Sequence, residues 1–298
     1  MNSHKSGFIA IIGRPNVGKS TLMNRLLGQK VSIVSPRPQT TRTKVMGIKS
    51  LPAAQLIFLD TPGIDKSGGY FHRLMVKTAT NSLEGADLIL WIVEAPDPFS
   101  QADKLIMEIL KRVTSPILLT INKVDLVEKE SLLPTIDRFR GLLPFAEIVP
   151  ISAVAGDNVV LLESLLVQYL PEGPPLYPVD QLTDQPERFT IAELIRERVF
   201  RSVYQEIPYA VAVQVEKVKA REGRALTDVA ATIYVEKDSQ KAIIIGRGGS
   251  MLKRIGESAR PEIEKLLGTQ VFLKLWVKVR GDWQKDDEAL KRLGYLQA

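Results

Sequence analysis

The chain has 298 residues, enough for two domains with separate cores, and its 45% hydrophobic and 25% charged content is typical of a globular protein. It has no cysteine and no apolar run near the ~18 residues that span a bilayer, and no secretory signal is expected at its amino terminus. These features exclude disulfides and thiolate zinc sites and argue against a membrane-spanning or secreted protein.

The first part of the chain alternates short apolar runs with helical patterns. Buried-looking strands separated by helices predict an α/β fold with a mostly parallel sheet covered on both faces, which binds ligands at the carboxyl ends of its strands. The predicted strands are 8–12, 56–59, 88–94, 117–122 and 148–150, and the predicted helices are 20–27, 71–83, 101–113 and 159–170.

The string GRPNVGKS follows the first predicted strand and opens the first predicted helix. It fits the phosphate-loop pattern, in which backbone N–H groups converge on phosphate oxygens at a helix amino terminus. Lys19 is expected to reach the β- and γ-phosphates, and the Ser20 hydroxyl is expected to bind Mg²⁺. A purely structural turn is the alternative, which the strand–loop–helix setting disfavours.

The string DTPG closes the second predicted strand. Asp60 is expected to hold Mg²⁺ through a water molecule, and the Gly63 N–H to contact the γ-phosphate. Alone, the string would be a turn with Pro and Gly; after a phosphate loop it indicates the second half of a triphosphate site.

NKVD after the fourth predicted strand indicates which base is bound. A carboxylate at Asp125 can accept two hydrogen bonds from guanine, whereas adenine would leave that charge unpaired. Asn122 is expected to brace neighbouring loops, Lys123 to cover the base plane, and the Ala153 N–H to meet the guanine carbonyl oxygen. The expected nucleotide contacts are Gly13, Arg14, Pro15, Asn16, Val17, Gly18, Lys19, Ser20, Thr21, Asp60, Thr61, Pro62, Gly63, Asn122, Lys123, Asp125, Ser152, Ala153 and Val154.

Five prolines between Pro171 and Pro186 disfavour both helix and central strand, so the linker is predicted there. The predicted domains are 1–172 and 189–298, joined by a linker at 173–188. In the second domain the pattern predicts helix 191–205, strands 210–218 and 228–236, two helices around Gly246, strand 271–279 and a short helix at 287–293.

The string IIIGRGGSMLKR predicts a helix, a tight glycine loop and a second helix. Gly246 to Gly249 match the GXXG loop of KH domains, where small side chains let ~four single-stranded nucleotides approach closely. Residues 237–260 carry six Lys and Arg against two Asp and Glu, out of a net charge of +6, which favours phosphate contact over a solvated helix face. The expected RNA contacts are Lys241, Ile243, Ile244, Ile245, Gly246, Arg247, Gly248, Gly249, Lys253 and Arg254.

Three other features are less informative. The strand VFLKLWVKV alternates apolar and basic residues, and a core position for Trp276 is favoured over stacking on a base. Trp283 has no assignable role. The two histidines, His4 and His72, are isolated, so they are expected to be exposed and do not indicate a metal site.

The four nucleotide strings together resemble the translation-factor-related P-loop GTPases, and GRPNVGKS, QTTR and DTPG resemble the Era and tRNA-modification groups within that class. The resemblance implies that QTTR lies in a switch, where Thr41, less readily Thr40, meets Mg²⁺ and the γ-phosphate. The implied catalytic residues are Lys19, Thr41, Gly63 and Asn16, and the implied metal contacts are Ser20, Thr41 and Asp60. Asn16 implies K⁺ binding beside the phosphates, with loop bracing as an equal alternative.

One residue departs from the Ras-like pattern. Ile64 follows DTPG where Ras-like proteins place a glutamine that orients the attacking water. Slow intrinsic hydrolysis is therefore expected, with positioning and charge neutralisation supplying most of the catalysis.

A P-loop GTPase domain joined to a helix–strand–strand–helix–GXXG–helix–strand domain, the type II KH order, resembles the Era family of bacterial GTPases over nearly the whole chain. That resemblance implies binding of GTP and GDP, binding of 16S ribosomal RNA near its 3′ end, and assistance in assembling the small (30S) subunit. It also implies a cytoplasmic protein with peripheral attachment to the inner membrane face, and no DNA partner.

The expected mechanism is that GTP and Mg²⁺ order switches at 39–42 and 63–73, and that the ordered state favours RNA binding. Two other classes stay open. One is an enzyme that modifies RNA chemically, against which the sequence shows no second set of catalytic side chains. The other is a signalling switch whose KH-like segment binds protein.

Overall fold

The computed structural model of the chain describes residues 4–66 and 68–296, so position 67 of the predicted second switch lies outside the described residues. The chain forms two compact units that divide between Asp184 and Gln185, inside the range 173–188 expected to link the domains. No helix in the described ranges has the length and apolar character needed to cross a bilayer.

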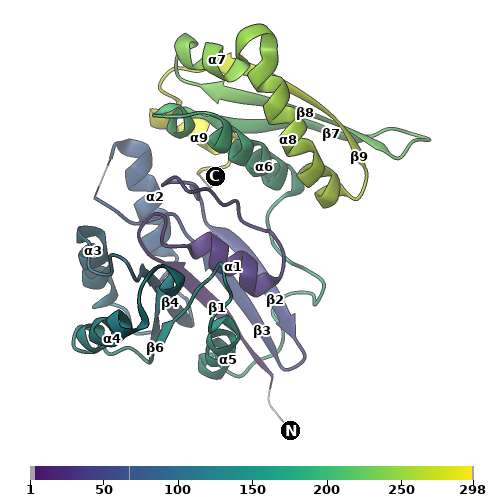
Figure 1. Cartoon of the computed structure of the whole chain (residues 1–298). Helices are drawn as coiled ribbons and strands as arrows, with labels where there is room; N and C mark the ends of the chain where they lie inside the picture. Colours follow the sequence, from purple (N-terminus) through teal and green to yellow (C-terminus); the bar gives the residue numbers. More distant parts are fainter. Residues whose placement is uncertain (1–3, 67, 297–298) are drawn as a thin grey trace. The chain divides into compact units, whose positions relative to one another are not determined.

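The first unit is built on one six-stranded sheet with the order β2-β3-β1-β4-β5-β6 (Figure 1). Five strands are parallel and β2 pairs antiparallel with β3 at the edge, which confirms the predicted mostly parallel sheet. The strands are β1 (Lys5–Ile12), β2 (Val45–Leu51), β3 (Ala54–Asp60), β4 (Leu88–Glu94), β5 (Ile117–Asn122) and β6 (Glu147–Pro150).

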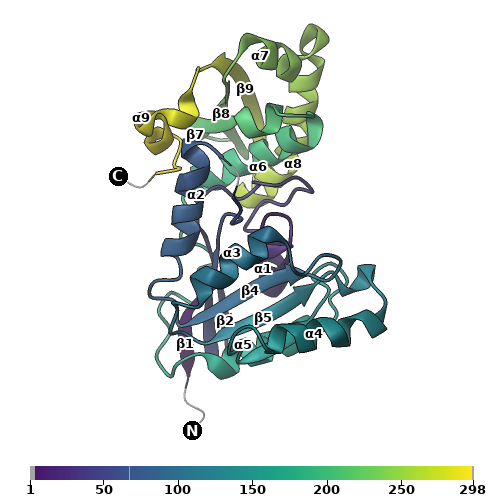
Figure 2. The ribbon, with the colours of Figure 1, turned by 90° about the vertical axis from the view of Figure 1, so that its left-hand side faces the viewer.

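Helices cover both faces of this sheet. Side chains of α2, α3 and α4 share one core with β1, β4 and β5, whereas α1 and α5 contact β3. In Figure 2, α3 and α4 lie on the viewer's side of the sheet. The long apolar strands explain this arrangement, because strands buried on both faces need a helix layer on each side. The helices are α1 (Lys19–Leu27), α2 (Tyr70–Asn81), α3 (Gln101–Leu110), α4 (Leu132–Arg140) and α5 (Val159–Tyr169).

The sequence pattern missed two of these elements, β2 and α4. Gly47 interrupts the apolar run of β2, and polar residues follow it, so the alternation expected of a half-buried strand is weak. In α4, Pro134 reads as a breaker, but it lies in the first helical turn, where its missing N–H has no intrahelical partner to lose.

The segment that follows α5 is held along the β2–β3 edge. The Gln55 side chain accepts hydrogen bonds from the N–H groups of Leu176 (2.7 Å) and Tyr177 (2.9 Å). The Thr183 hydroxyl donates to the Met46 carbonyl at 2.6 Å. Hydrogen bonds to these two strands therefore fix part of the proline-rich range.

The second unit has a three-stranded sheet with the order β7-β8-β9, in which β7 and β8 are antiparallel and β8 and β9 parallel. Helices α6, α7 and α8 share one core with the sheet, so they cover one of its faces. Its order matches the predicted helix–strand–strand–helix–loop–helix–strand. The elements are α6 (Glu187–Ser202), β7 (Ala212–Ala220), β8 (Leu226–Val235), α7 (Asp238–Ile245), α8 (Ser250–Leu267), β9 (Gln270–Val279) and α9 (Asp287–Arg292).

The prediction that Trp276 is a core residue is wrong: 44% of it is exposed. In β9 the odd-numbered Val271 and Val277 are buried, and successive strand residues point to opposite faces, so Trp276 lies on the other face. Trp283 instead is fully buried, and its ring N–H donates to the Ala210 carbonyl at 3.0 Å.

The expectation of two exposed histidines is also wrong. His72 in α2 is 7% exposed, and its Nε2 lies 2.8 Å from a carboxylate oxygen of Asp65. His4 is half-buried, with Nδ1 3.0 Å from the Gly173 carbonyl oxygen. Both partners come from loops, which a pattern of isolated histidines does not reveal.

Candidate nucleotide site and nucleic-acid interface

The loop between β1 and α1 carries the predicted phosphate-binding lysine. The Lys19 ammonium donates to the carbonyl oxygens of Gly13 (3.0 Å) and Arg14 (2.9 Å), so the loop curls around it at the helix amino terminus. Burial lowers the pKa of Lys19 to about 8, against the attraction of Asp60 and Asp65. A buried cation at a helix amino terminus is suited to polyphosphate binding.

Three of the predicted metal contacts converge on one carboxylate. The Ser20 hydroxyl donates to Oδ2 of Asp60 at 2.6 Å and lies 2.9 Å from the Thr41 hydroxyl, which is itself 3.4 Å from that carboxylate. Burial raises the pKa of Asp60, although these hydroxyl groups and Lys19 oppose the shift. The other oxygen, Oδ1, is buried and accepts no hydrogen bond within the described parts of the chain.

This donor set fits Mg²⁺. Magnesium prefers oxygen ligands and is commonly held by one or two carboxylates together with hydroxyls, waters and substrate phosphates. A cation beside Asp60 would also compensate a buried carboxylate with an orphan oxygen. Ser32 was not predicted, yet its hydroxyl donates to the same Oδ2 at 2.7 Å.

The structure separates the two switch threonines. The Thr40 hydroxyl donates to the Arg37 carbonyl at 2.8 Å, whereas the Thr41 hydroxyl faces Asp60. The switch also contacts α2, because the guanidinium of Arg42 lies 5.7 Å from the ring centre of Phe71. The preference for Thr41 over Thr40 therefore agrees with the geometry.

DTPG lies against the phosphate loop. A Cβ added to Gly63 would lie 2.6 Å from the backbone nitrogen of Pro15, so only glycine allows this approach. The Ile64 N–H donates to the Gly13 carbonyl at 3.2 Å, and its side chain is fully buried. Ile64 consequently cannot orient a water molecule at the phosphates.

Asn122 joins three loops around the expected base site. Its amide donates to the Val17 carbonyl at 2.7 Å, and its oxygen accepts the Ala153 N–H at 2.9 Å. The predicted bracing role is therefore seen. To meet guanine as expected, the Ala153 N–H must share or exchange its bond to Asn122. Asp125 is exposed in the turn Val124–Leu126.

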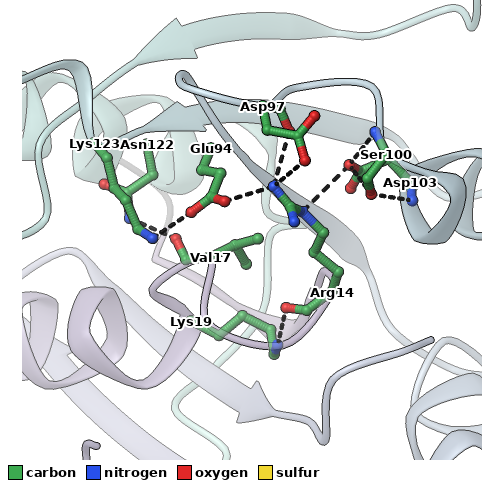
Figure 3. Close-up of polar contacts among 9 residues, drawn as sticks. All are labelled: Arg14, Val17, Lys19, Glu94, Asp97, Ser100, Asp103, Asn122 and Lys123. Carbon is green, nitrogen blue, oxygen red and sulfur yellow. Dashed lines mark hydrogen bonds and ion pairs between the residues drawn. The ribbon is translucent and has the colours of Figure 1, made fainter. Parts of the chain in front are cut away.

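An ion-pair network ties the phosphate loop to the base loop (Figure 3). Glu94, at the end of β4, accepts from Arg14 of the phosphate loop at 2.6 Å and pairs with Lys123 of NKVD through its other oxygen. Arg14 also approaches Asp97 (3.2 Å), which follows β4, and Asp103 (3.4 Å) in the first turn of α3. Glu94 thus positions two residues that the sequence assigned to nucleotide contact.

A cavity in the first unit brings the phosphate loop and the first switch together. Asn16, one of its lining residues, donates to the Pro36 carbonyl at 3.0 Å and so braces the switch loop. Thr61 is another predicted nucleotide contact, but its side chain is buried and its hydroxyl donates to the Ile11 carbonyl at 2.7 Å, so the side chain supports the loop. The lining residues are Pro15, Asn16, Gly18, Lys19, Ser20, Thr21, Ile33, Val34, Ser35, Gln39, Thr40, Thr41 and Gly63.

Sequence reasoning also missed Arg25. Its guanidinium donates to the carbonyls of Val154 (2.9 Å) and Ala155 (2.8 Å), so α1 supports the loop that carries Ala153. A weak signal was available for Glu94, a charged residue that ends a buried strand at the ligand edge of the sheet. No local signal marks Arg25 or Ser32, whose partners are distant in the sequence.

In the second unit, the GXXG loop joins α7 to α8. Gly248 and Gly249 have φ values of 57° and 81°, and a Cβ added to either meets no atom within 4 Å. Beside the loop, a groove runs between α8 and β9, lined by Lys253 and Arg260 on the helix and by Phe272 on the strand. Its lining combines apolar side chains with these two cations and one carboxylate, that of Glu257, so it has the apolar and net basic character that suits a single nucleic-acid strand.

The structure corrects one expected RNA contact. Ile244 is fully buried in the core of the second unit, because this face of α7 packs against the sheet, and it cannot line the groove. Its neighbour Ile243 is 49% exposed. Arg247, Lys253 and Arg254 are exposed around the loop, whereas Lys241 is half-buried.

Comparison with known proteins matches both units. Residues 8–123 match the family model described as 50S ribosome-binding GTPase, and residues 206–284 match the KH domain model. Geobacter metallireducens GTPase Era is 52% identical over 99% of both chains, and Staphylococcus haemolyticus GTPase Era is 47% identical over 100% of this chain and 99% of that protein.

Two solved structures cover almost the whole chain. Era in complex with MgGDPNP and nucleotides 1506–1542 of 16S ribosomal RNA is 42% identical with a TM-score of 0.96, over 99% of this chain and 100% of that one. A single-residue variant of Aquifex aeolicus Era bound to GDP·AlF4⁻ is 41% identical with a TM-score of 0.95, over 98% and 100% of the two chains.

Proposed function

The chain belongs to the GTPase Era family, and we propose on that basis that it is a GTP-hydrolysing switch that binds 16S ribosomal RNA near its 3′ end. Its proposed role is to assist assembly of the small ribosomal subunit. The observation that carries this proposal is that one chain holds both the Ser20–Thr41–Asp60 cluster beside Lys19 and a GXXG loop beside a basic groove.

The hydrolysis step depends on positioning and charge. Lys19 and the N–H groups of the phosphate loop neutralise the β- and γ-phosphates as charge develops in the transition state. Gly63 lies against Pro15 of the phosphate loop, which suits its proposed contact with the γ-phosphate. Since Ile64 is buried, none of its atoms activates the attacking water, which supports slow intrinsic hydrolysis.

Ser20, Thr41 and Asp60 are the residues that would hold Mg²⁺, with Asp60 acting through a water molecule. When bound, the ion neutralises charge on the phosphate oxygens. The chain's own contribution is to collect these oxygens around a buried carboxylate, which links the first switch to the phosphate loop.

We further propose that Asn16 helps to hold K⁺ beside the phosphates. Its position in the phosphate loop at the cavity wall supports this role, while its bond to the Pro36 carbonyl supports simple bracing. GTP hydrolysis is expected to be severalfold faster in KCl than in NaCl at equal ionic strength, and Asn16→Ala is expected to remove the difference. Equal rates in the two salts for the native protein would contradict K⁺ binding.

Nucleotide affinity is expected to fall as the pH rises through 8. Burial lowers the pKa of Lys19 to about 8, so above this pH the nucleotide-free protein holds a neutral amine that must take up a proton to meet the phosphates. The Kd for GDP should therefore rise about threefold to tenfold between pH 7 and pH 9, because each pH unit above the pKa costs up to a factor of ten.

Titration calorimetry measures this dependence. Lys19→Gln serves as the control, since it leaves a polar side chain, one heavy atom shorter, that has no proton to titrate and so reports only the titration of the nucleotide itself. If the native protein and Lys19→Gln had parallel pH profiles, the lowered pKa would play no part in binding.

The experiment that tests the RNA assignment is crosslinking of the protein to total cellular RNA with a non-hydrolysable GTP analogue, followed by sequencing of the trapped fragments. Enrichment of the 3′ end of 16S RNA is expected. Recovery of tRNA, or of no RNA above background, would refute the proposed partner.

The proposed location is the cytoplasm, where ribosomal subunits assemble. Peripheral attachment to the inner face of the membrane, implied by the resemblance, stays a prediction. Co-sedimentation of the protein with anionic vesicles tests it, and recovery in the supernatant at low salt would contradict it.

A further inference from the structure

The strand β9 presents an alternating aromatic and basic row on the face of the sheet opposite the helices. This row, the β9 outer face, consists of Phe272, Lys274, Trp276 and Lys278. Phe272 and Trp276 are 45% and 44% exposed, and the Lys278 side chain is 58% exposed. Two large exposed aromatic rings on one strand are unusual for a surface that contacts only water.

The neighbouring strands leave this row accessible and add positive charge. Across from Trp276, β8 carries the small residue Thr232, which bonds to Glu216 at 2.5 Å. On the same face β7 contributes Lys217 and Lys219. The acidic groups there are Glu216, which lies 4.0 Å from Lys278, and Asp228, which pairs with Arg221 at 2.6 Å.

Phe272 connects this face to the groove beside the GXXG loop. It belongs to the β9 outer face by its position in the strand, yet it also lines the groove with Lys253 and Arg260. Two cations lie near its ring centre, the Arg221 guanidinium at 5.3 Å and the Lys274 ammonium at 5.5 Å. The groove and the outer face therefore form one continuous basic surface around the edge strand.

We propose that single-stranded RNA leaving the groove crosses β9 and stacks a base on Trp276, while Lys274 and Lys278 meet its phosphates. Stacking platforms combined with lysines are how proteins hold single strands without reading every base. Alternate residues of a strand recur about every 6.6 Å, a spacing that lets successive nucleotides of an extended strand meet successive side chains. The positive charge favours a nucleic acid over an apolar protein partner.

This inference rests on the proposed RNA-binding function, and the test separates the two. Three RNAs are compared. The first is just long enough to fill the groove, the second is longer by about six nucleotides at its 5′ end, and the third is longer by about six nucleotides at its 3′ end. The native protein is expected to bind one extended RNA about tenfold more tightly than the short one, which lies within the range measured for stacking of a single base. Trp276→Ala should remove that gain without changing the affinity for the short RNA.

Two controls make the comparison specific. Tyr204→Ala removes another exposed aromatic of the same unit, 72% exposed but outside the β9 outer face, and should change neither affinity. Trp276→Phe keeps a ring and should restore most of the gain. Lys274→Gln should lower the salt dependence of binding for the extended RNA only, by about one phosphate contact.

Fluorescence gives an independent readout. Trp91 and Trp283 are buried, so Trp276 is the exposed member of the three tryptophans, and stacking should quench its emission with the extended RNA alone. Equal affinity of the native protein for all RNAs, or equal losses for short and extended RNAs in Trp276→Ala, would overturn the inference. Failure of the native protein to bind even the short RNA would instead refute the proposed function.

Discussion

Replacing Asp125 by asparagine is expected to lower the affinity for GDP and GTP by about a thousandfold or more and to create affinity for xanthine nucleotides. The carboxylate accepts hydrogen bonds from the ring N–H and the exocyclic amine of guanine. An asparagine side chain offers one acceptor and one donor, so its amide N–H₂ would face the guanine amine and leave both unpaired. Losses of ~10⁴ follow when a site built for such bonds leaves polar groups unmatched.

Xanthine carries a carbonyl where guanine carries that amine, so it complements the new amide. Isothermal titration with GDP, xanthosine diphosphate and ADP measures the change. Asp137→Asn is the matched control, because Asp137 lies on the exposed surface of α4, where it pairs with Arg140. Retention of guanine affinity in Asp125→Asn would mean that the base is bound elsewhere.

The substitution Gly248→Asp is expected to weaken RNA binding about a hundredfold or more while leaving GTP binding and hydrolysis intact. Gly248 has a φ of 57°, and an added side chain would project into open space beside the groove, where the backbone of the RNA is expected to pass. A carboxylate there removes the close approach and repels phosphates, and like-charge juxtaposition of this kind costs several kcal/mol.

Gly268→Asp is the matched control for this variant. Gly268 also has a positive φ (63°), and a Cβ added there meets no atom within 4 Å, so the backbone strain is similar and the added charge is equal. It lies beyond the carboxyl end of the 18-residue helix α8, about 27 Å along that helix from the GXXG loop. Filter binding and thermal unfolding of both variants separate lost contact from lost folding, and equal RNA affinities of the two variants would contradict the groove assignment.

Much of the nucleotide site could be predicted from the sequence because its parts are local. The phosphate loop, DTPG and NKVD each follow a strongly apolar strand, and the carboxyl ends of parallel strands meet at one edge of the sheet. The convergence of Ser20, Thr41 and Asp60 agrees with that reasoning. The identity of Thr41, rather than Thr40, came from resemblance and is matched by its contact with Asp60.

The features that the sequence did not predict depend on contacts between segments that are distant in the chain. Glu94 pairs with residues from two other loops, so its position at the end of a buried strand indicates a place near the ligand but not these partners. Alternation along β9 predicts that one face of the strand is buried, but it does not show which face. The large apolar ring of Trp276 favours a core position, whereas the structure places it on the exposed face. Ile244 was assigned to the groove because the helical run IIIG does not show which isoleucine turns toward the core.

The most direct measurement of nucleotide control is the affinity of the purified protein for 16S RNA nucleotides 1506–1542, the fragment bound by the solved relative, with GDP and with a non-hydrolysable GTP analogue at one fixed salt concentration. The account predicts at least about tenfold tighter binding in the GTP-analogue state and, by reciprocity, an equal increase in the affinity for that analogue relative to GDP when RNA is bound. Identical RNA affinities with both nucleotides would contradict it.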